Sequence, residues 1–161
     1  MLRSVINRVF AYEHIDGCGV NDYLHRWRLL AGPAGRALYL HRYVGSDWAS
    51  RVLHDHPKTF LSIGLWGGYV EEFAVWCEQP PTTINGRLVR RYALIWERNE
   101  RRQFRAPWIR TFPPEHMHRL RVTKRGCWTL VYVGPHVKDW YFWPKRMRTP
   151  AHRYIAENGD C

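Results

Sequence analysis

Short strand-like runs separated by turn residues are the feature that most restricts the fold of this chain. The runs cover residues 23–31, 36–44, 52–57, 59–66, 69–77 and 87–96, and further runs follow up to residue 134. Gly and Pro stand between several of them, as in Gly32-Pro33-Ala34-Gly35 and Gly67-Gly68. Many short strands without alternating long helices predict an antiparallel sandwich or barrel, and they disfavour a parallel α/β sheet.

The two ends of the chain differ from this pattern. Residues 2–10 carry apolar side chains at helix-like spacing, which predicts a short N-terminal helix. The segment after Trp140 is basic and contains Pro144 and Pro150, which predicts an irregular tail. A length of 161 residues suits one domain. We therefore expect a lead-in with a helix at 1–22, an all-β barrel at 23–144 and a basic tail at 145–161.

The charge of the chain is strongly positive. Lys and Arg number 25 against 14 Asp and Glu, for a net charge of +11. This makes nucleic acid a candidate partner, although a basic surface attracts any polyanion. No apolar run approaches the roughly 18 residues of a membrane helix, and the N-terminus lacks a signal-peptide pattern. Four scattered cysteines without a CxxC pair are expected to be free thiols. We expect a cytoplasmic protein with no membrane contact.

Two pairs of histidines stand out because each pair is spaced two residues apart. His54 and His56 belong to one strand-like run, and His116 and His118 belong to a later one. Residues i and i+2 of a strand point to the same face, so each pair can converge on one point inside a barrel. Imidazole is a common ligand of iron, zinc, copper and nickel. We predict a site for one divalent metal ion on His54, His56 and His118, with His116 as the alternative third ligand.

At this point the sequence resembles the cupin family, whose pattern is HxH on one strand, a glycine-ended turn and a later histidine on a returning strand. More closely, it is similar to small cupin-like proteins of bacteria and their phages. The resemblance covers roughly residues 23–144 and rests on five segments in order: Leu53-His54-Asp55-His56-Pro57, Gly67-Gly68-Tyr69-Val70-Glu71, His118-Arg119, Trp128-Thr129-Leu130 and Gly134-Pro135 with Trp140. It implies a jelly-roll barrel. Cupins often form dimers, so the resemblance also makes a homodimer plausible.

The chain departs from the usual cupin pattern at one metal ligand. A cupin has a glutamate four or five residues after its second histidine, and these positions hold Phe60 and Leu61 here. The resemblance then implies a three-histidine centre like that of the thiol dioxygenases, with Fe(II) as the first choice and Zn(II) or Ni(II) as others. Glu71 or Glu72 could still reach the metal from the next strand. A rival HxD motif, His14-Ile15-Asp16, is too short to carry weight alone.

Three functions remain open on this reading. The first is a mononuclear non-haem dioxygenase or oxygenase that acts on a small anionic substrate. The second is a cupin isomerase or epimerase in which Glu71 or Tyr69 is the catalytic base. The third is a non-enzymatic module that binds an anionic sugar, nucleotide or nucleic acid. Candidate substrate-binding residues are Arg42, Arg51, Arg110, Trp66 and Trp128, and Asp47 is the candidate for orienting a metal-binding histidine.

Overall fold

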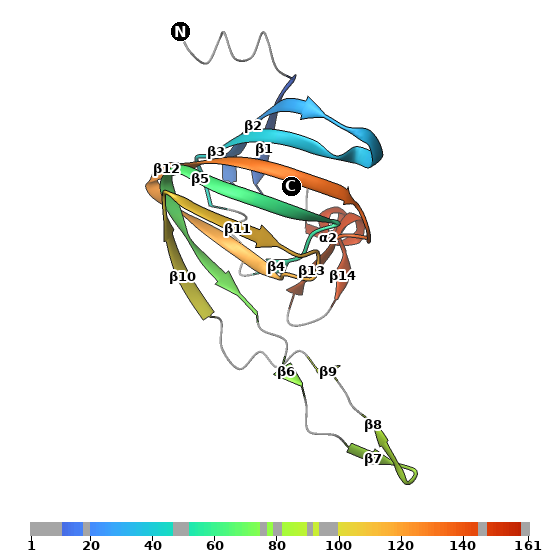
Figure 1. The fold of residues 1–161 in the computed structure, drawn as a ribbon. Helices are drawn as coiled ribbons and strands as arrows, with labels where there is room; N and C mark the ends of the chain where they lie inside the picture. The colour runs from blue at the N-terminus through green and yellow to red at the C-terminus, as the bar shows by residue number, and fades with distance from the viewer. Residues whose placement is uncertain are drawn as a thin grey trace, which may run out of the picture.

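Residues 11–17, 20–46, 52–74, 77–78, 82–89, 92–93, 100–144 and 148–158 are described by the structure, which is a computed structural model (Figure 1). The predicted N-terminal helix at 2–10 lies outside these residues, as do Asp47 and Arg51. Within the described part, no helix is long and apolar enough to cross a membrane.

Antiparallel strands dominate the described chain. The first half contains β1 (Ala11–Gly17), β2 (Val20–Ala31), the 3-10 turn η1 (Pro33–Gly35), β3 (Ala37–Tyr43), β4 (Leu53–His54) and β5 (Lys58–Phe73). Short strands follow at β6 (Cys77–Glu78), β7 (Thr82–Ile84), β8 (Arg87–Val89) and β9 (Tyr92–Ala93). The second half contains β10 (Glu100–Arg105), β11 (Trp108–Phe112), β12 (His118–His136), β13 (Tyr141–Trp143), β14 (Thr149–Pro150) and the helix α2 (Ala151–Asn158).

One large sheet joins most of these strands, in the order β1-β2-β3-β12-β4-β13-β14, while β5 pairs with β10, β11 and β12. The hairpin predicted from residues 23–31 and 36–44 is confirmed as β2 and β3. The strand β1 pairs with β2, so the sheet begins at Ala11 rather than at residue 23. The all-β, antiparallel fold class is confirmed.

The long strands β5 and β12 bend and so contribute to two layers (Figure 1). The first half of β5 pairs with β11 and with the second half of β12, whereas its second half pairs with β10 and with the first half of β12. The sequence pattern predicted a break at Gly67, but the chain continues there as one strand. Gly67 has φ +74°, and a Cβ there would lie 2.0 Å from the carbonyl oxygen of Gly126. Glycine therefore permits a bend with close backbone contact where a chain reversal was expected.

Residues 149–158 form regular structure, which corrects the expectation of an irregular tail over this range. The strand β13 pairs with β14, and α2 follows directly. Ala151, Tyr154 and Phe142 form a buried cluster, in which the rings of Phe142 and Tyr154 are 4.7 Å apart. Pro144 and Pro150 led to the expectation of irregular structure. Ala151 and Tyr154 are nevertheless three residues apart and share one helix face. Pro150 lies just ahead of the helix, where it does no harm.

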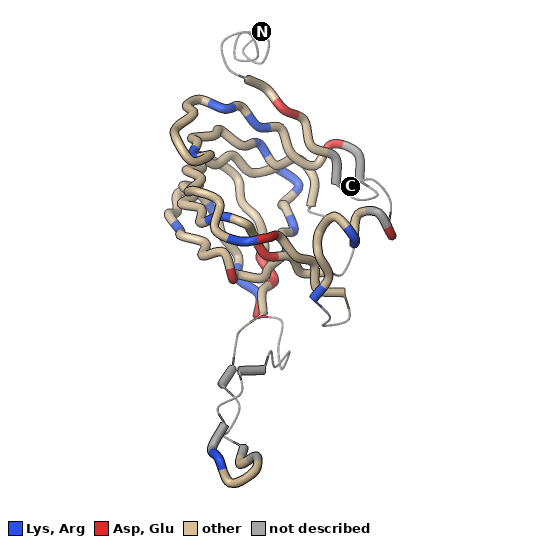
Figure 2. The backbone as a smooth tube through the Cα atoms, turned by 90° about the vertical axis from the view of Figure 1, so that its right-hand side faces the viewer, with Lys and Arg blue, Asp and Glu red and all other residues tan. Residues whose placement is uncertain are grey.

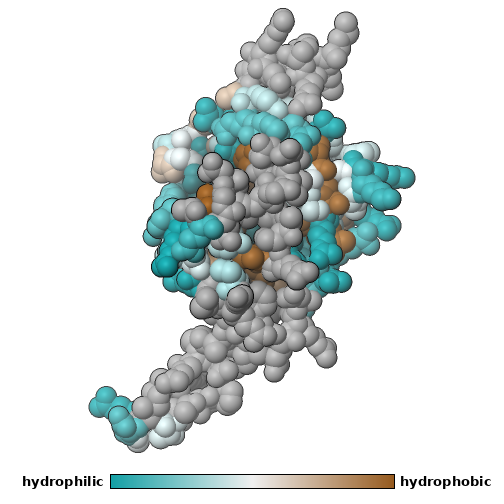
Figure 3. All heavy atoms as spheres, turned by 180° about the vertical axis from the view of Figure 1, so that it is seen from behind, coloured by the Kyte–Doolittle hydropathy of each residue, from teal (hydrophilic) through white to brown (hydrophobic). Residues whose placement is uncertain are grey.

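The surface and the core follow from the strand pattern. Lys and Arg are distributed over many strands rather than gathered at one end (Figure 2). Seen from behind, hydrophilic side chains cover much of the described surface and hydrophobic ones show in its middle (Figure 3). A central cluster contains Tyr69, Leu120 and Cys127, with Trp108 and Phe104 packed against it. Cys127 is fully buried, and this burial raises the pKa of its thiol to about 11.

Candidate metal centre and cavity

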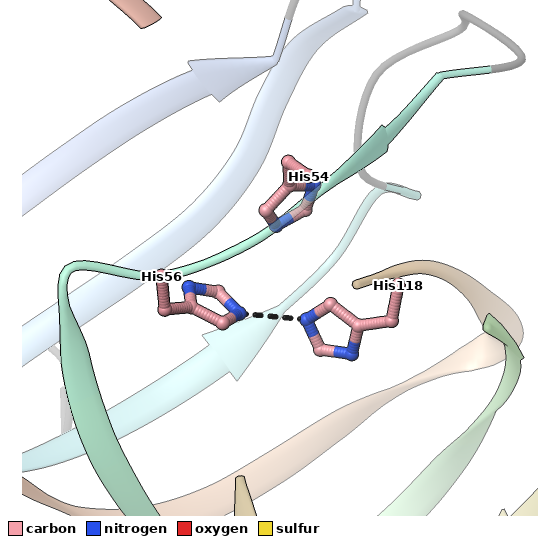
Figure 4. A group of neighbouring side chains, drawn as sticks. All are labelled: His54, His56 and His118. Carbon is pink, nitrogen blue, oxygen red and sulfur yellow. Dashed lines mark hydrogen bonds between the residues drawn. The ribbon is translucent and has the colours of Figure 1, made fainter. Parts of the chain in front are cut away.

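His54, His56 and His118 converge, and Figure 4 shows their rings facing one another. Their ligand nitrogens all lie within 4.8 Å of one another. The Nε2 atoms of His56 and His118 are 2.8 Å apart, and the ring centres of His54 and His118 are 5.2 Å apart. His118 is also the register partner of His54 across β4 and β12. The fold thus brings together the three histidines that the sequence selected.

The residue between the two first histidines fixes their segment from the other side. Asp55 is buried, and its carboxylate accepts hydrogen bonds from the Tyr141 backbone N–H at 2.8 Å and from Lys138 Nζ at 2.6 Å. The backbone N–H of Asp55 in turn donates to the Tyr141 carbonyl at 3.1 Å. Because successive residues of an extended chain point to opposite sides, anchoring Asp55 holds His54 and His56 toward the site.

Glu71 lies behind His118 and contacts His116, away from His54 and His56. Its Oε1 atom accepts hydrogen bonds from Nδ1 of His118 at 2.6 Å and from Nε2 of His116 at 2.8 Å. Its Oε2 atom accepts from Arg110 at 2.5 Å, and the side chain is fully buried. A proton held on Nδ1 of His118 leaves Nε2 with its lone pair toward His56, which is the arrangement found behind many metal-binding histidines.

The three histidines are neutral and Glu71 is ionised, which are the protonation states that favour binding of a cation. Burial lowers the pKa of His54 and of His56 well below the usual value, and neighbouring histidines lower them further. Burial also lowers the pKa of His118, against the opposing effect of Glu71. Burial alone would raise the pKa of Glu71, but hydrogen bonds from His116 and His118 and the charge of Arg110 lower it below the usual range. The site therefore combines neutral imidazoles with an ionised carboxylate behind them.

This donor set fits a divalent ion of borderline softness, such as iron, zinc or nickel. A second group of potential ligands, Glu71, His116 and His118, uses the opposite side of the His118 ring. Glu71 in that group is already paired with Arg110, and neither Glu71 nor His116 lines the cavity described next. The candidate ligands are thus His54, His56 and His118, and Glu71 lies behind the His118 ring.

An internal cavity of about 250 Å³ opens beside the histidines. Its walls include Phe60, Tyr69, Phe112 and Trp140 together with His54, His56 and His118. The ring of Phe60 lies 4.7 Å from the ring of His56 and forms part of this wall. Phe60 therefore replaces the cupin glutamate with an apolar contact.

A row of polar side chains crosses the cavity face of the sheet. Arg26 pairs in register with Glu13 on one side and His41 on the other, and His41 pairs with Thr129. Arg26, His41 and Thr129 line the cavity. Among the described residues, Nε2 of His41 and the hydroxyl of Thr129 have no hydrogen-bond partner although both are buried. Burial, and then the charge of Arg26, lower the pKa of His41 to about 3, so this imidazole is neutral.

Arg26, His41 and Thr129 were not predicted as cavity residues, although the sequence contains a signal for the first two. The triplet Leu-His-Arg occurs at residues 24–26 and again at residues 40–42. In the antiparallel pair β2 and β3, Arg26 lies opposite His41 and His25 lies opposite Arg42. The first pair faces the cavity, and the second faces the other side of the sheet.

The remaining predicted substrate-binding residues are placed elsewhere. Arg42, Trp66 and Trp128 line a separate hollow, together with Lys124 and Arg125. Arg110 is held by Glu71 and lies over the rings of Phe104 and Phe112. Tyr69 does line the cavity. Glu72, the other carboxylate considered as a ligand, pairs with Arg101 and Arg119. Arg51 lies outside the described residues.

Comparison with known proteins supports the fold. No family model matches the chain, and no curated protein matches it in sequence. A solved cupin-2 domain protein, Rru_A2000 from Rhodospirillum rubrum, aligns with 11% identity and a TM-score of 0.53, over 81% of this chain and 73% of that one. A structure from a study of the DMSP lyases RdDddP and RnDddQII aligns with 13% identity and a TM-score of 0.50, over 81% of this chain and 60% of that one.

These likenesses show that the chain has a cupin fold. The histidine group and the cavity beside it define a candidate metal site within that fold.

Proposed function

We propose that this chain is a metal-dependent cupin enzyme in which His54, His56 and His118 bind one divalent ion. Its substrate is a small molecule that occupies the neighbouring cavity. The observation that carries the proposal is the convergence of three neutral imidazoles at the wall of a cavity, with an ionised carboxylate behind one of them. The His118 side chain is buried, and those of His54 and His56 are partly buried. The volume of about 250 Å³ lies at the small end of ligand pockets, which favours a small molecule over a polymer.

Three neutral ligands leave the full positive charge of a divalent ion in place, so an anionic or chelating substrate group is attracted to it. Fe(II) is the metal we propose first, because it would supply a Lewis acid and an electron source for O2, as in non-haem dioxygenases. The chain itself would supply orientation. Glu71 holds the ring of His118, and Asp55 holds the segment of His54 and His56.

The environments of Glu71 and Tyr69, the two candidate bases, argue against an isomerase. Glu71 is fully buried and its two oxygens are occupied by His116, His118 and Arg110, so it is not positioned to take a proton from a substrate. Burial raises the pKa of Tyr69 above its usual value, so this phenol keeps its proton. Both bases considered from the sequence are thereby unsuited to that role, whereas an oxygenase does not require them.

The far part of the cavity supplies the contacts for a substrate. The Nε2 atom of His41 and the hydroxyl of Thr129 offer two unused hydrogen-bonding groups, and Arg26 offers a positive charge. Arg26 is already paired with Glu13 at 2.8 Å, so the row as a whole is close to neutral. A buried polar atom without a partner costs free energy, and a polar substrate would remove that cost.

Metal content tests the proposal. Untagged protein loaded with Fe(II) without oxygen, or with Zn(II), should retain an ion that the His54→Ala, His56→Ala double variant loses. His152→Ala is the matched control, because His152 is exposed on α2. Equal metal retention in the double variant and the wild type would overturn the proposal. Oxygen consumption that depends on Fe(II) and on these histidines would then identify the oxygenase class.

A binding role for the separate hollow is the second candidate. There the Arg42 guanidinium lies 5.6 Å from the Trp128 ring centre, and Trp66 is half exposed beside Lys124 and Arg125. Aromatic rings with adjacent cations suit single-stranded nucleic acid. Binding of a labelled oligonucleotide that falls steeply with salt, survives His54→Ala and is lost in Trp66→Ala would support this role. Binding that Trp66→Ala leaves unchanged would exclude it.

A further inference from the structure

A further group of potential metal ligands, away from the cavity, lies on the β1–β2 hairpin. His14 and His25 are register partners across these strands, and Asp22 precedes His25 by three residues. The ligand atoms of the three residues lie within 4.8 Å of one another. None of the three lines the cavity of His54, His56 and His118. The group is therefore separate from the proposed active site.

Two imidazole nitrogens in this group converge on one carboxylate oxygen. Oδ1 of Asp22 lies 2.6 Å from Nε2 of His25 and 3.0 Å from Nε2 of His14. The two rings are nearly parallel, with centres 4.9 Å apart and an angle of 12° between their planes. A stack of this kind directs both Nε2 atoms to the same side. Neighbouring ligand atoms of a tetrahedral ion with bonds of about 2.0–2.1 Å lie roughly 3.3 Å apart, so these hydrogen-bonded atoms would have to separate by less than about 1 Å to hold one ion.

The rear of the group is also arranged as in a metal site. The hydroxyl of Tyr12 is hydrogen-bonded to Nδ1 of His25 at 2.7 Å, so a group behind the ring holds it from the side opposite Asp22. Glu71 does the same for His118 at the first site. Such a contact fixes the orientation of a metal-binding imidazole.

Exposure distinguishes this group from the first one. The side chain of His25 is almost fully buried, whereas those of His14 and Asp22 are 40% and 55% exposed. An ion can enter from solvent without passing through the cavity. The rival HxD motif of the sequence contributes His14, and the carboxylate of Asp22 faces this histidine.

We propose that His14, Asp22 and His25 form a second site for a divalent transition-metal ion, with Zn(II) or another borderline ion as its ligand. Two imidazoles and one carboxylate are a donor set that such ions accept. The site joins β1 to the beginning of β2, and β1 is the terminal strand of the sheet order. A bound ion would stabilise the pairing of β1 with β2, independently of the chemistry proposed for the cavity.

Counting metal equivalents tests the second site. Chelator-stripped, untagged full-length protein is titrated with Co(II), followed by visible absorption, and with Zn(II), followed by calorimetry. The expected result is two equivalents for the wild type, one for His14→Ala and one for the His54→Ala, His56→Ala variant. The triple variant, which combines His14→Ala with His54→Ala and His56→Ala, should bind no metal. The His152→Ala control should keep two equivalents. Tyr12→Phe should weaken the second site about 10-fold and leave the first unchanged.

The two proposals fail in different ways in this experiment. A wild type with one equivalent that the His54→Ala, His56→Ala variant loses would overturn the second site alone. One equivalent that His14→Ala loses and the double variant retains would overturn the first site alone. Asp22→Asn repeats the test with a nearly isosteric change, and circular dichroism confirms that each variant is folded. Zn(II) should also raise the Tm of the double variant, and a triple variant with the same rise would contradict the proposal.

Discussion

The two faces of the strands β2, β3 and β12 carry similar residues and give them different environments. His41 and Thr129 face the cavity, while their chain neighbours Arg42 and Trp128 line the separate hollow on the other face. On the cavity face, burial leaves His41 neutral and leaves polar atoms without partners. On the other face, the Arg42 guanidinium lies over the Trp128 ring. Adjacent positions in the sequence can therefore belong to different sites.

The comparison shows that enclosure, more than residue type, determines what a side chain can do here. On the cavity face, the side chains of His41 and Thr129 are buried and largely removed from water, whereas Trp66 beside the separate hollow is half exposed. Loss of water shifts each ionisable group toward its neutral form unless a partner of opposite charge is close. Glu71 has such partners and stays ionised, whereas His41 has a cation as its neighbour and stays neutral. Variants on the enclosed side should accordingly have the larger effects.

The largest effect is expected for Glu71→Ala. The change removes the partner of Arg110, whose side chain is 17% exposed, and a broken buried ion pair costs about 3–5 kcal/mol. Urea unfolding measures this loss. Glu100→Ala on β10 is the matched control, since Glu100 is an exposed carboxylate, and its change should stay within about 0.5 kcal/mol. Similar losses in the two variants would show that enclosure is not decisive.

Glu71→Ala should also reduce metal affinity at His118 by roughly 10- to 100-fold, because the ring loses the contact that orients it. Glu71→Gln keeps an oxygen toward His118 and should retain more of the affinity. An unchanged affinity in the alanine variant would remove Glu71 from the site.

The next effect concerns the dependence of stability on pH. The pKa of His41 is about 3 in the folded chain and ordinary in the unfolded chain, so between these values the unfolded chain binds the extra proton. Stability is therefore retained above pH 6.5 and falls as the pH decreases toward 3. From pH 6 to pH 4, His41 should account for about 2 kcal/mol of the loss. His41→Gln should remove this part, and Arg42→Gln, its neighbour on the other face, should not. Parallel curves for the wild type and His41→Gln would contradict the assignment.

The smallest effect is expected for Thr129→Val, and its sign is opposite. The buried hydroxyl of Thr129 has no partner among the described residues, so its replacement by a methyl group should stabilise the fold by about 1 kcal/mol. Thr111→Val on the exposed side of β11 should change stability by less than about 0.5 kcal/mol. Destabilisation by Thr129→Val would mean that the hydroxyl has a partner in solution. Thermal unfolding is sufficient to measure both.

Much of the metal site follows from local patterns in the sequence. His54, His56 and His118 were predicted from strand periodicity and from the resemblance to cupins, and the fold brings them together. The role of Glu71 could not be predicted in this way. Its position behind His118 depends on the bend of β5 at Gly67, where the pattern indicated a turn between two strands.

The residues that line the cavity were harder to predict because they depend on the side of the sheet. Arg42 and Arg26 occur in identical triplets, and the periodicity of a strand does not say which of its faces is inside. The register of β2 against β3 decides this, and it places Arg26 beside the cavity. The helix α2 was missed for a different reason, since two prolines outweighed a short apolar spacing.

The strand β12 lies between β3 and β5 and pairs with both. A ribosome makes the chain from its N-terminus, so β3 and β5 are complete while β12 has still to be added. During that interval each of them has one side without a neighbour, and open strand edges promote association between chains. His54 and His56 are likewise made before His118, because β5 to β11 lie between them in the chain. Closure of the barrel and completion of the three-histidine group therefore coincide, late in synthesis.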